Sequence, residues 1–182
     1  MLISTPQNRD RQGAEFHTYL ITFACYGSHL PGQPGIVDRD YSYYGGRFRE
    51  PDSEKEVRVR SRMSQAPFQL DATSRTIVLE AIKEACSRRV WRLLAAHVRS
   101  NHVHVVIAAN RSPEHVMSTL KSNASRALNN ARIDTPDRLR WARHGSTRYL
   151  WTHEQISAAI HYVVCEQGEP MEVYAMPRAS AP

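Results

Sequence analysis

The sequence contains few cysteines, and they do not form pairs. Among 182 residues there are three, Cys25, Cys86 and Cys165, and all are far apart. Without a C-x-x-C pair, the sequence indicates neither a zinc knuckle nor a disulfide framework, and a reducing compartment fits best.

Long apolar segments are also missing. No run approaches the about 20 residues that a membrane-spanning helix requires. Residues 1–11 are polar and lack the apolar centre of a signal peptide. We therefore expect a cytoplasmic protein that has no membrane partner.

Lysine is scarce beside arginine. The chain has 24 lysines and arginines together, of which only Lys55, Lys83 and Lys121 are lysines, and a formal net charge of +6. Arginine suits phosphate because its planar guanidinium donates two hydrogen bonds at once. An arginine excess can equally reflect genome composition, but a basic balance favours a polyanionic partner, nucleic acid first.

The order of apolar patterns predicts one domain over residues 15–170, between a disordered arm at 1–14 and a flexible tail at 171–182. A first strand is expected at 16–25. Residues 33–70 are expected to form an inserted loop region. Its first part, 33–52, mixes aromatic and basic residues, which can stack bases and hold phosphates or form an ordinary surface loop. Residues 53–70 fit either an edge strand or the start of a helix.

The second half of the chain alternates more regularly. We expect a helix at 72–87 capped by Asp71, strands at 90–98 and 102–107, and a helix from Ser112-Pro113 to about 130. A charged loop at 131–147, a short strand at 148–151 and a helix at 153–167, opened by Thr152 and Gln155, complete the pattern. This order, βαββαβ, predicts an α+β fold with a ferredoxin-like antiparallel sheet, helices on one face and an added C-terminal helix.

Two histidines lie on the expected central strand. Alternate side chains of a strand share a face, so His102 and His104 point to one side and Val103, Val105 and Ile107 to the other. Two imidazoles on one rigid strand can form two corners of a metal site. Ordinary core histidines are the other interpretation, and the pattern alone leaves both open.

The last helix places a tyrosine near a carboxylate. Tyr162 and Glu166 are four residues apart, so they are neighbours on the helix surface, beside its apolar stripe. Gln167 lies about 140° round from Tyr162 in an unbroken helix, although a frayed last turn would bring it back. This arrangement could offer a nucleophile and a third metal ligand, or simply packing.

The segment Ser100-Asn101-His102-Val103-His104 resembles the Pro-Asn-His-hydrophobic-His signature of HUH-endonuclease transposases with a single catalytic tyrosine. It is most similar to the REP-associated tyrosine transposases and their insertion-sequence relatives. Further similarity lies in residues 22–32, 120–129 and 144–151, and in Tyr162-Val163 with Gln167-Gly168. Two positions depart from the family pattern: Ser100 replaces the usual proline, and Glu166 precedes the glutamine that usually serves as the third metal ligand.

The resemblance implies a metal-dependent endonuclease and strand transferase acting on single-stranded DNA beside a REP-like hairpin. Tyr162 would attack the scissile phosphate and leave a 5′-phosphotyrosine link and a 3′-hydroxyl. Mg²⁺ or Mn²⁺ would bind to His102, His104 and Glu166, with Gln167 as the substitute for Glu166. The family's fold, a ferredoxin-like sheet, agrees with the element order.

Contacts to the DNA backbone are expected from Arg99, Asn101, Lys121, Ser122 and Arg126, three of which lie on a small, cationic helix face. A homodimer is possible, since the family contains dimers and monomers. Two other functions stay open: a silent module that binds hairpin nucleic acid, and a metal hydrolase that forms no covalent intermediate.

Overall fold

Helices and strands make up most of the part of the chain that the computed structural model describes, residues 15–28, 30–31, 33 and 51–177. The strands are β1 (His17–Cys25), β2 (Arg92–Val98), β3 (His102–Ala109), β4 (Trp141–Leu150) and β5 (Glu172–Ala175). The helices are α1 (Ser53–Ser61), α2 (Ala72–Arg88), α3 (Pro113–Asn130) and α4 (His153–Cys165).

The five strands form one antiparallel sheet in the order β4-β1-β3-β2-β5. β1, α2, β2, β3, α3 and β4 follow one another in the βαββαβ order. The ferredoxin-like α+β fold predicted from the sequence is therefore confirmed, and β3, the histidine strand, occupies the centre of the sheet.

The helices begin where the sequence provides caps. The Asp71 side chain accepts a hydrogen bond from the backbone N–H of Ser74, and Ser112 caps α3 just before Pro113. At α4, Thr152 and Gln155 form the predicted capping box. Each cap satisfies a backbone donor that the first turn of a helix leaves without an intrahelical partner.

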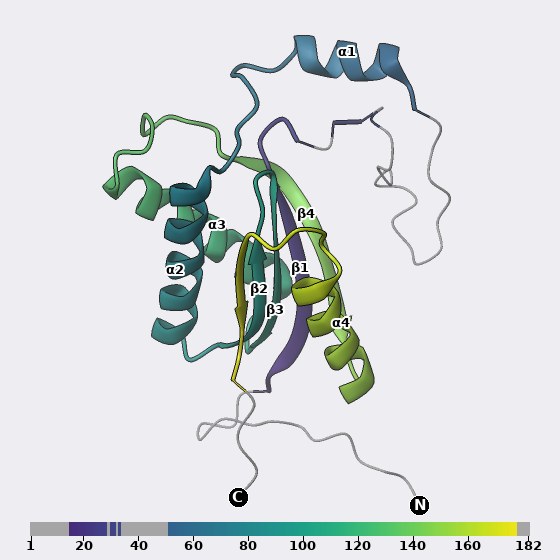
Figure 1. Cartoon of the computed structure of the whole chain (residues 1–182), viewed down its shortest axis with the longest axis vertical. Helices are drawn as coiled ribbons and strands as arrows, with labels where there is room; N and C mark the ends of the chain where they lie inside the picture. The colour runs from purple at the N-terminus through teal and green to yellow at the C-terminus, as the bar shows by residue number, and fades with distance from the viewer. Residues whose placement is uncertain (1–14, 29, 32, 34–50, 178–182) are drawn as a thin grey trace, which may run out of the picture.

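The two faces of the sheet carry different helices (Figure 1). α2 and α3 pack on one face, where Val103, Val105 and Ile107 of β3 enter the main core, as the strand pattern predicted. α4 packs on the opposite face, against Val106 of β3 and neighbouring strands. This second, smaller apolar layer holds α4 over the histidine side of β3.

Two segments differ from the sequence predictions, and a third takes one of the two structures that the sequence left open. Residues 141–147, predicted as loop, form the first part of β4, which pairs with β1 over most of its length. Its side chains are mostly exposed, so the apolar alternation that marks a strand is missing. The flexible tail expected at 171–182 contains β5, and the ambiguous residues 53–61 are helical, with Asp52 as N-cap.

The disordered arm predicted at 1–14 and most of the aromatic and basic loop at 33–52 lie outside the described residues.

Candidate functional site

His102 and His104 lie side by side on the face of β3 that α4 covers. Their ring centroids are 4.6 Å apart and their planes meet at 79°, edge to face. His104 is buried, with 6% of its surface exposed, whereas His102 is half-buried at the end of the strand. The period of two in a strand thus produces the pair of imidazoles predicted from the sequence.

Hydrogen bonds at Nδ1 orient both rings. The Oδ1 of Asn101 lies 2.7 Å from His102 Nδ1, and the Oγ1 of Thr22 lies 2.7 Å from His104 Nδ1. An amide oxygen can only accept, so Nδ1 of His102 carries its proton and Nε2 carries the lone pair. Neighbours that fix the tautomer of a ligating histidine in this way are typical of metal sites.

Burial keeps His104 neutral. It lowers the pKa of this imidazole to about 3, and the nearby His102 and His97 shift it in the same direction. A hydrogen bond between the ring and the Gln167 side chain acts in the opposite sense and raises the pKa. His104 is therefore uncharged at neutral pH, which is the form that binds a metal ion.

Tyr162 lies directly against this pair. Its ring meets the His104 ring edge to face, with centroids 5.6 Å apart, and 39% of its surface is exposed. It occupies the last turns of α4, beside Val163, which is buried in the α4 layer. The phenol thus combines a fixed position next to His104 with access from solvent, which a nucleophile toward a large substrate requires.

Of the two candidates for a third ligand, Gln167 is the one that reaches the histidines. The helix ends at Cys165, and the Gln167 side chain bonds to the His104 ring and donates from Nε2 to the Tyr162 carbonyl at 3.1 Å. Glu166 turns outward, and its Oε1 lies 2.8 Å from His161 Nδ1. The helical spacing pointed to Glu166 because it assumed an unbroken helix, whereas Glu166 is already the C-cap.

Among the described residues, no three histidine, cysteine, aspartate or glutamate side chains gather at one point. The side chains that the structure brings together here are the two imidazoles and the Gln167 amide.

The residues predicted to contact DNA divide between the two faces. Asn101 adjoins His102, and Arg99 lies close enough to depress the pKa of His104 while donating to the Glu169 carbonyl at 3.0 Å. Ser122 and Arg126 are exposed on α3, on the opposite side of the sheet. The structure brings Arg99 and Asn101, but not the α3 residues, to the histidines.

Lys121 serves the fold instead. Its Nζ donates to the carbonyls of Ala142 and His144 at 2.9 and 3.1 Å and lies 5.6 Å from the centre of the Phe23 ring. Burial lowers the pKa of this amine. Its hydrogen bonds hold β4 to α3, so the DNA contact expected of Lys121 competes with an internal role.

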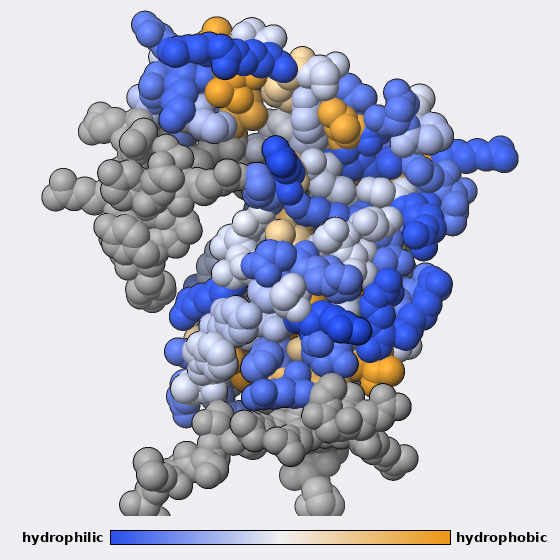
Figure 2. Space-filling model, turned by 180° about the vertical axis from the view of Figure 1, so that it is seen from behind, coloured by the Kyte–Doolittle hydropathy of each residue, from blue (hydrophilic) through white to orange (hydrophobic). Residues whose placement is uncertain are grey.

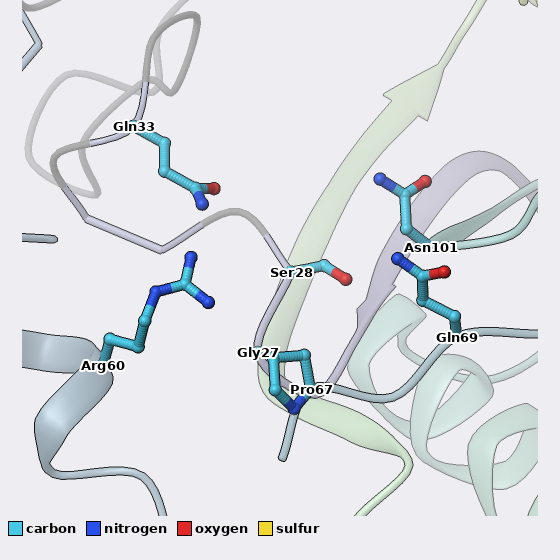
Figure 3. Close-up of a pocket in the computed structure, with 7 residues that line it drawn as sticks. All are labelled: Gly27, Ser28, Gln33, Arg60, Pro67, Gln69 and Asn101. Atoms are coloured by element: carbon cyan, nitrogen blue, oxygen red, sulfur yellow. The ribbon is translucent and has the colours of Figure 1, made fainter. Parts of the chain in front are cut away.

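A polar cavity of about 270 Å³ opens beside the histidine strand. Figure 3 shows Gln33 and Arg60 on one side of it and Gln69 and Asn101 on the other, with Ser28 between them. Its lining residues are Gly27, Ser28, Gln33, Arg60, Pro67, Gln69 and Asn101. Asn101 belongs both to this wall and to the hydrogen bond that orients His102. The cavity and the histidine pair are therefore contiguous.

Sequence reasoning missed the roles of Thr22 and His97. Thr22 faces His104 because β1 and β3 pair with these two residues opposite each other, and His97 faces His104 in the same way from β2. The expected hairpin of β2 and β3 could have predicted the position of His97, since a short turn fixes which residues of the two strands lie opposite each other.

The face seen in Figure 2 is largely hydrophilic, with small apolar patches. In the part of the chain that the structure describes, no helix combines the length and apolar character needed to cross a membrane.

Among the comparisons with known proteins, the family-model match agrees with the sequence motifs. No curated protein matches the chain. A solved structure of a REP-associated tyrosine transposase bound to a REP hairpin resembles it with a TM-score of 0.46 and 9% identity, over 82% of this chain and 66% of that chain. The family model for IS200-like transposases matches residues 62–164, more than half of the chain and including both histidines and Tyr162. This chain belongs to the IS200-like transposase family.

Proposed function

We propose that the protein is a metal-dependent endonuclease and strand transferase that cuts single-stranded DNA beside a hairpin through a 5′-phosphotyrosine intermediate. The observation that supports it most directly is the contact of Tyr162 with His104 on one side of the same β-sheet. A nucleophile and a pair of potential metal ligands meet there within one chain.

The residues present fit a divalent metal ion. His102 and His104 offer neutral imidazoles whose Nδ1 atoms are held by Asn101 and Thr22, and the Gln167 amide adjoins the His104 ring. Two imidazole nitrogens and an amide oxygen suit Mn²⁺, and Mg²⁺ with added waters. We propose His102, His104 and Gln167 as the ligands; Glu166, the ligand expected from helical spacing, pairs with His161 instead. A bound ion would polarise the scissile phosphate and offset developing charge.

Tyr162 supplies the nucleophile in this mechanism. Its phenolic oxygen forms a bond to the scissile phosphorus, the bond from phosphorus to the 3′-oxygen breaks, and the 3′-oxygen leaves as a hydroxyl. The phosphodiester energy is retained in the phosphotyrosine, so a 3′-hydroxyl can attack in the reverse sense and rejoin the strand. Because Tyr162 lies against His104, its phenol is held near the place where the proposed metal ligands would orient the scissile phosphate.

The surroundings of the site suit a single strand of DNA. Arg99 and Asn101 flank the histidines, and the cavity beyond Asn101 presents amide, hydroxyl and guanidinium groups, which can hydrogen-bond to bases and phosphates. The basic balance of the chain, +6, adds sequence-independent attraction to nucleic acid. The requirement for a REP-like hairpin follows from the family resemblance.

The test is denaturing electrophoresis of the protein with labelled single-stranded hairpin DNA, with Mn²⁺, Mg²⁺ or chelator, for wild type and Tyr162→Phe. We expect a covalent protein–DNA band with metal in wild type and no band in the variant or with chelator. Cleavage without that band, surviving in Tyr162→Phe, would establish the metal hydrolase instead. Hairpin binding without band or cleavage would establish the silent binding module.

A further inference from the structure

His97 is a third histidine beside the candidate site, and the mechanism above does not use it. It lies on β2 directly opposite His104 in the pairing of β2 with β3. Its side chain is completely buried, with 0% of its surface exposed. A polar ring in this position requires partners for both nitrogens, because an unsatisfied buried polar group is costly.

Both ring nitrogens of His97 bond to backbone atoms. Nδ1 lies 3.0 Å from the Val163 carbonyl oxygen, and Nε2 accepts from the N–H of Met171 at 3.2 Å. A carbonyl oxygen only accepts, so Nδ1 carries the ring proton and the Nε2 lone pair faces Met171. With both nitrogens engaged, His97 offers no lone pair to a metal ion, and a role as ligand is excluded.

The two backbone partners of His97, Val163 and Met171, lie at the two ends of the segment that joins the last turn of α4 to β5. Val163 follows Tyr162 immediately, and its carbonyl belongs to the last turn of the helix, where carbonyls lack intrahelical partners. Met171 precedes β5, and Gln167 lies between the two. Arg99, which directly follows the end of β2, donates to the Glu169 carbonyl at 3.0 Å within the same segment.

We propose that His97 is a positioning residue that fixes the segment 163–171, and with it Tyr162 and Gln167, against His104. The imidazole joins the end of the tyrosine helix and the start of β5 to one point on the sheet. Loss of this link would leave α4 packed through its apolar stripe but would let Tyr162 and Gln167 move relative to His104. The effect on cleavage rests on the proposed function, whereas the order of the segment 163–171 does not.

Three variants separate the two hydrogen bonds. His97→Leu fills much of the space and removes both. His97→Asn places an amide N–H near the position of Nδ1 and can keep the bond to the Val163 carbonyl. His97→Gln places an acceptor near the position of Nε2 and can keep the bond from Met171. His153→Asn, at the exposed first turn of the same helix, is the matched control.

Two readouts are measured on the full chain: hydrogen exchange of the amides, and the rate of covalent adduct formation with a labelled hairpin DNA and Mn²⁺. In His97→Leu we expect exchange to rise by about tenfold or more within 163–171 but not in β1 or β3, and adduct formation to slow by about tenfold. Affinity for the DNA should stay within about twofold of wild type, because His97 is buried. His97→Asn should recover most of the rate, since Val163 adjoins Tyr162.

Adduct formation at the wild-type rate in His97→Leu, or exchange that rises equally across the sheet, would overturn the proposal. A slow rate in all three variants together with equal loss of DNA binding would likewise reduce His97 to a general contribution to folding. If wild type itself forms no adduct, the proposed function fails, while exchange confined to 163–171 would still establish His97 as the link between β2 and this segment.

Discussion

The Gln167 side chain reaches the His104 ring from the turn that follows α4, and it supports the protonated form of that imidazole. This contact joins β3, which carries both histidines, to the segment that follows α4.

The neighbouring residues Gln167 and Glu166 provide a matched pair for mutation. We expect Gln167→Ala to weaken Mn²⁺ binding by about 10- to 100-fold, because it removes the proposed oxygen ligand beside His104. Glu166→Gln should change the affinity by less than about twofold, since Glu166 pairs with the exposed His161. Titration with Mn²⁺, followed by electron paramagnetic resonance, measures both. The opposite ranking would return the ligand role to Glu166.

The hydrogen bond from His102 to Asn101 can be tested by changing the acceptor. Asn101→Ala should reduce Mn²⁺ affinity by about tenfold, because the His102 ring loses the group that fixes its orientation and tautomer. Asn101→Asp keeps an oxygen that accepts from Nδ1 and should retain most of the affinity. Equal losses in the two variants, measured by the same titration, would contradict this role.

Acid should weaken the fold through His104. Its folded pKa of about 3 lies below the ordinary value of 6.5. Between pH 3 and 6.5, His104 therefore binds a proton in the unfolded chain but stays neutral in the folded chain. Stability contributed by the neutral ring is present above pH 6.5 and is lost as the pH falls toward 3, by at most about 1.4 kcal/mol per pH unit.

Urea unfolding in chelator between pH 5 and 6.5 measures this slope, above the range where carboxylates such as Glu56 and Asp71, whose pKa values are lowered, take up protons. His104→Gln should show a shallower slope than wild type. Parallel slopes would mean that His104 does not control the acid sensitivity.

Lys121 and Arg126, both on α3, should behave differently when replaced. Lys121→Met should destabilise the fold by about 1–3 kcal/mol, because the carbonyls of Ala142 and His144 lose their donor, while DNA affinity changes little. Arg126→Ala leaves stability unchanged and, if α3 contacts the phosphate backbone, weakens DNA binding and its salt dependence. Thermal unfolding and fluorescence anisotropy at two salt concentrations separate these effects.

Local signals predicted most of the fold. The caps of α2, α3 and α4 and the alternating faces of β3 depend on neighbours in the sequence, so they were readable directly. The first part of β4 and the whole of β5 were not predicted, because edge strands depend on pairing with a distant strand rather than on apolar alternation. In β4, Gly145 approaches the Thr22 carbonyl and Met117 so closely that a side chain would not fit, a constraint visible only after pairing.

Long-range contacts also decided the details of the site. The sequence proposed His102, His104 and Tyr162, whose rings the structure brings together. The choice between Glu166 and Gln167 depended on where α4 ends, and Gly168, with a φ of +73°, turns the chain just beyond that point. Composition likewise could not separate arginines that are available to a nucleic-acid partner from structural ones. The buried Arg140 pairs with Asp134, and Arg138 donates to the carbonyls of Ala66 and Pro67.

The return of the chain to the sheet after α4 has a consequence for assembly. β4, which precedes α4, and β5, which follows it, form opposite edges of one sheet. Two copies of the chain that exchanged their α4 helices by domain swapping would have to break or exchange the ladder between β2 and β5 as well. Tyr162 contacts His104 within one chain, so a swapped dimer would have to carry α4 and β5 across together to rebuild this contact between two copies.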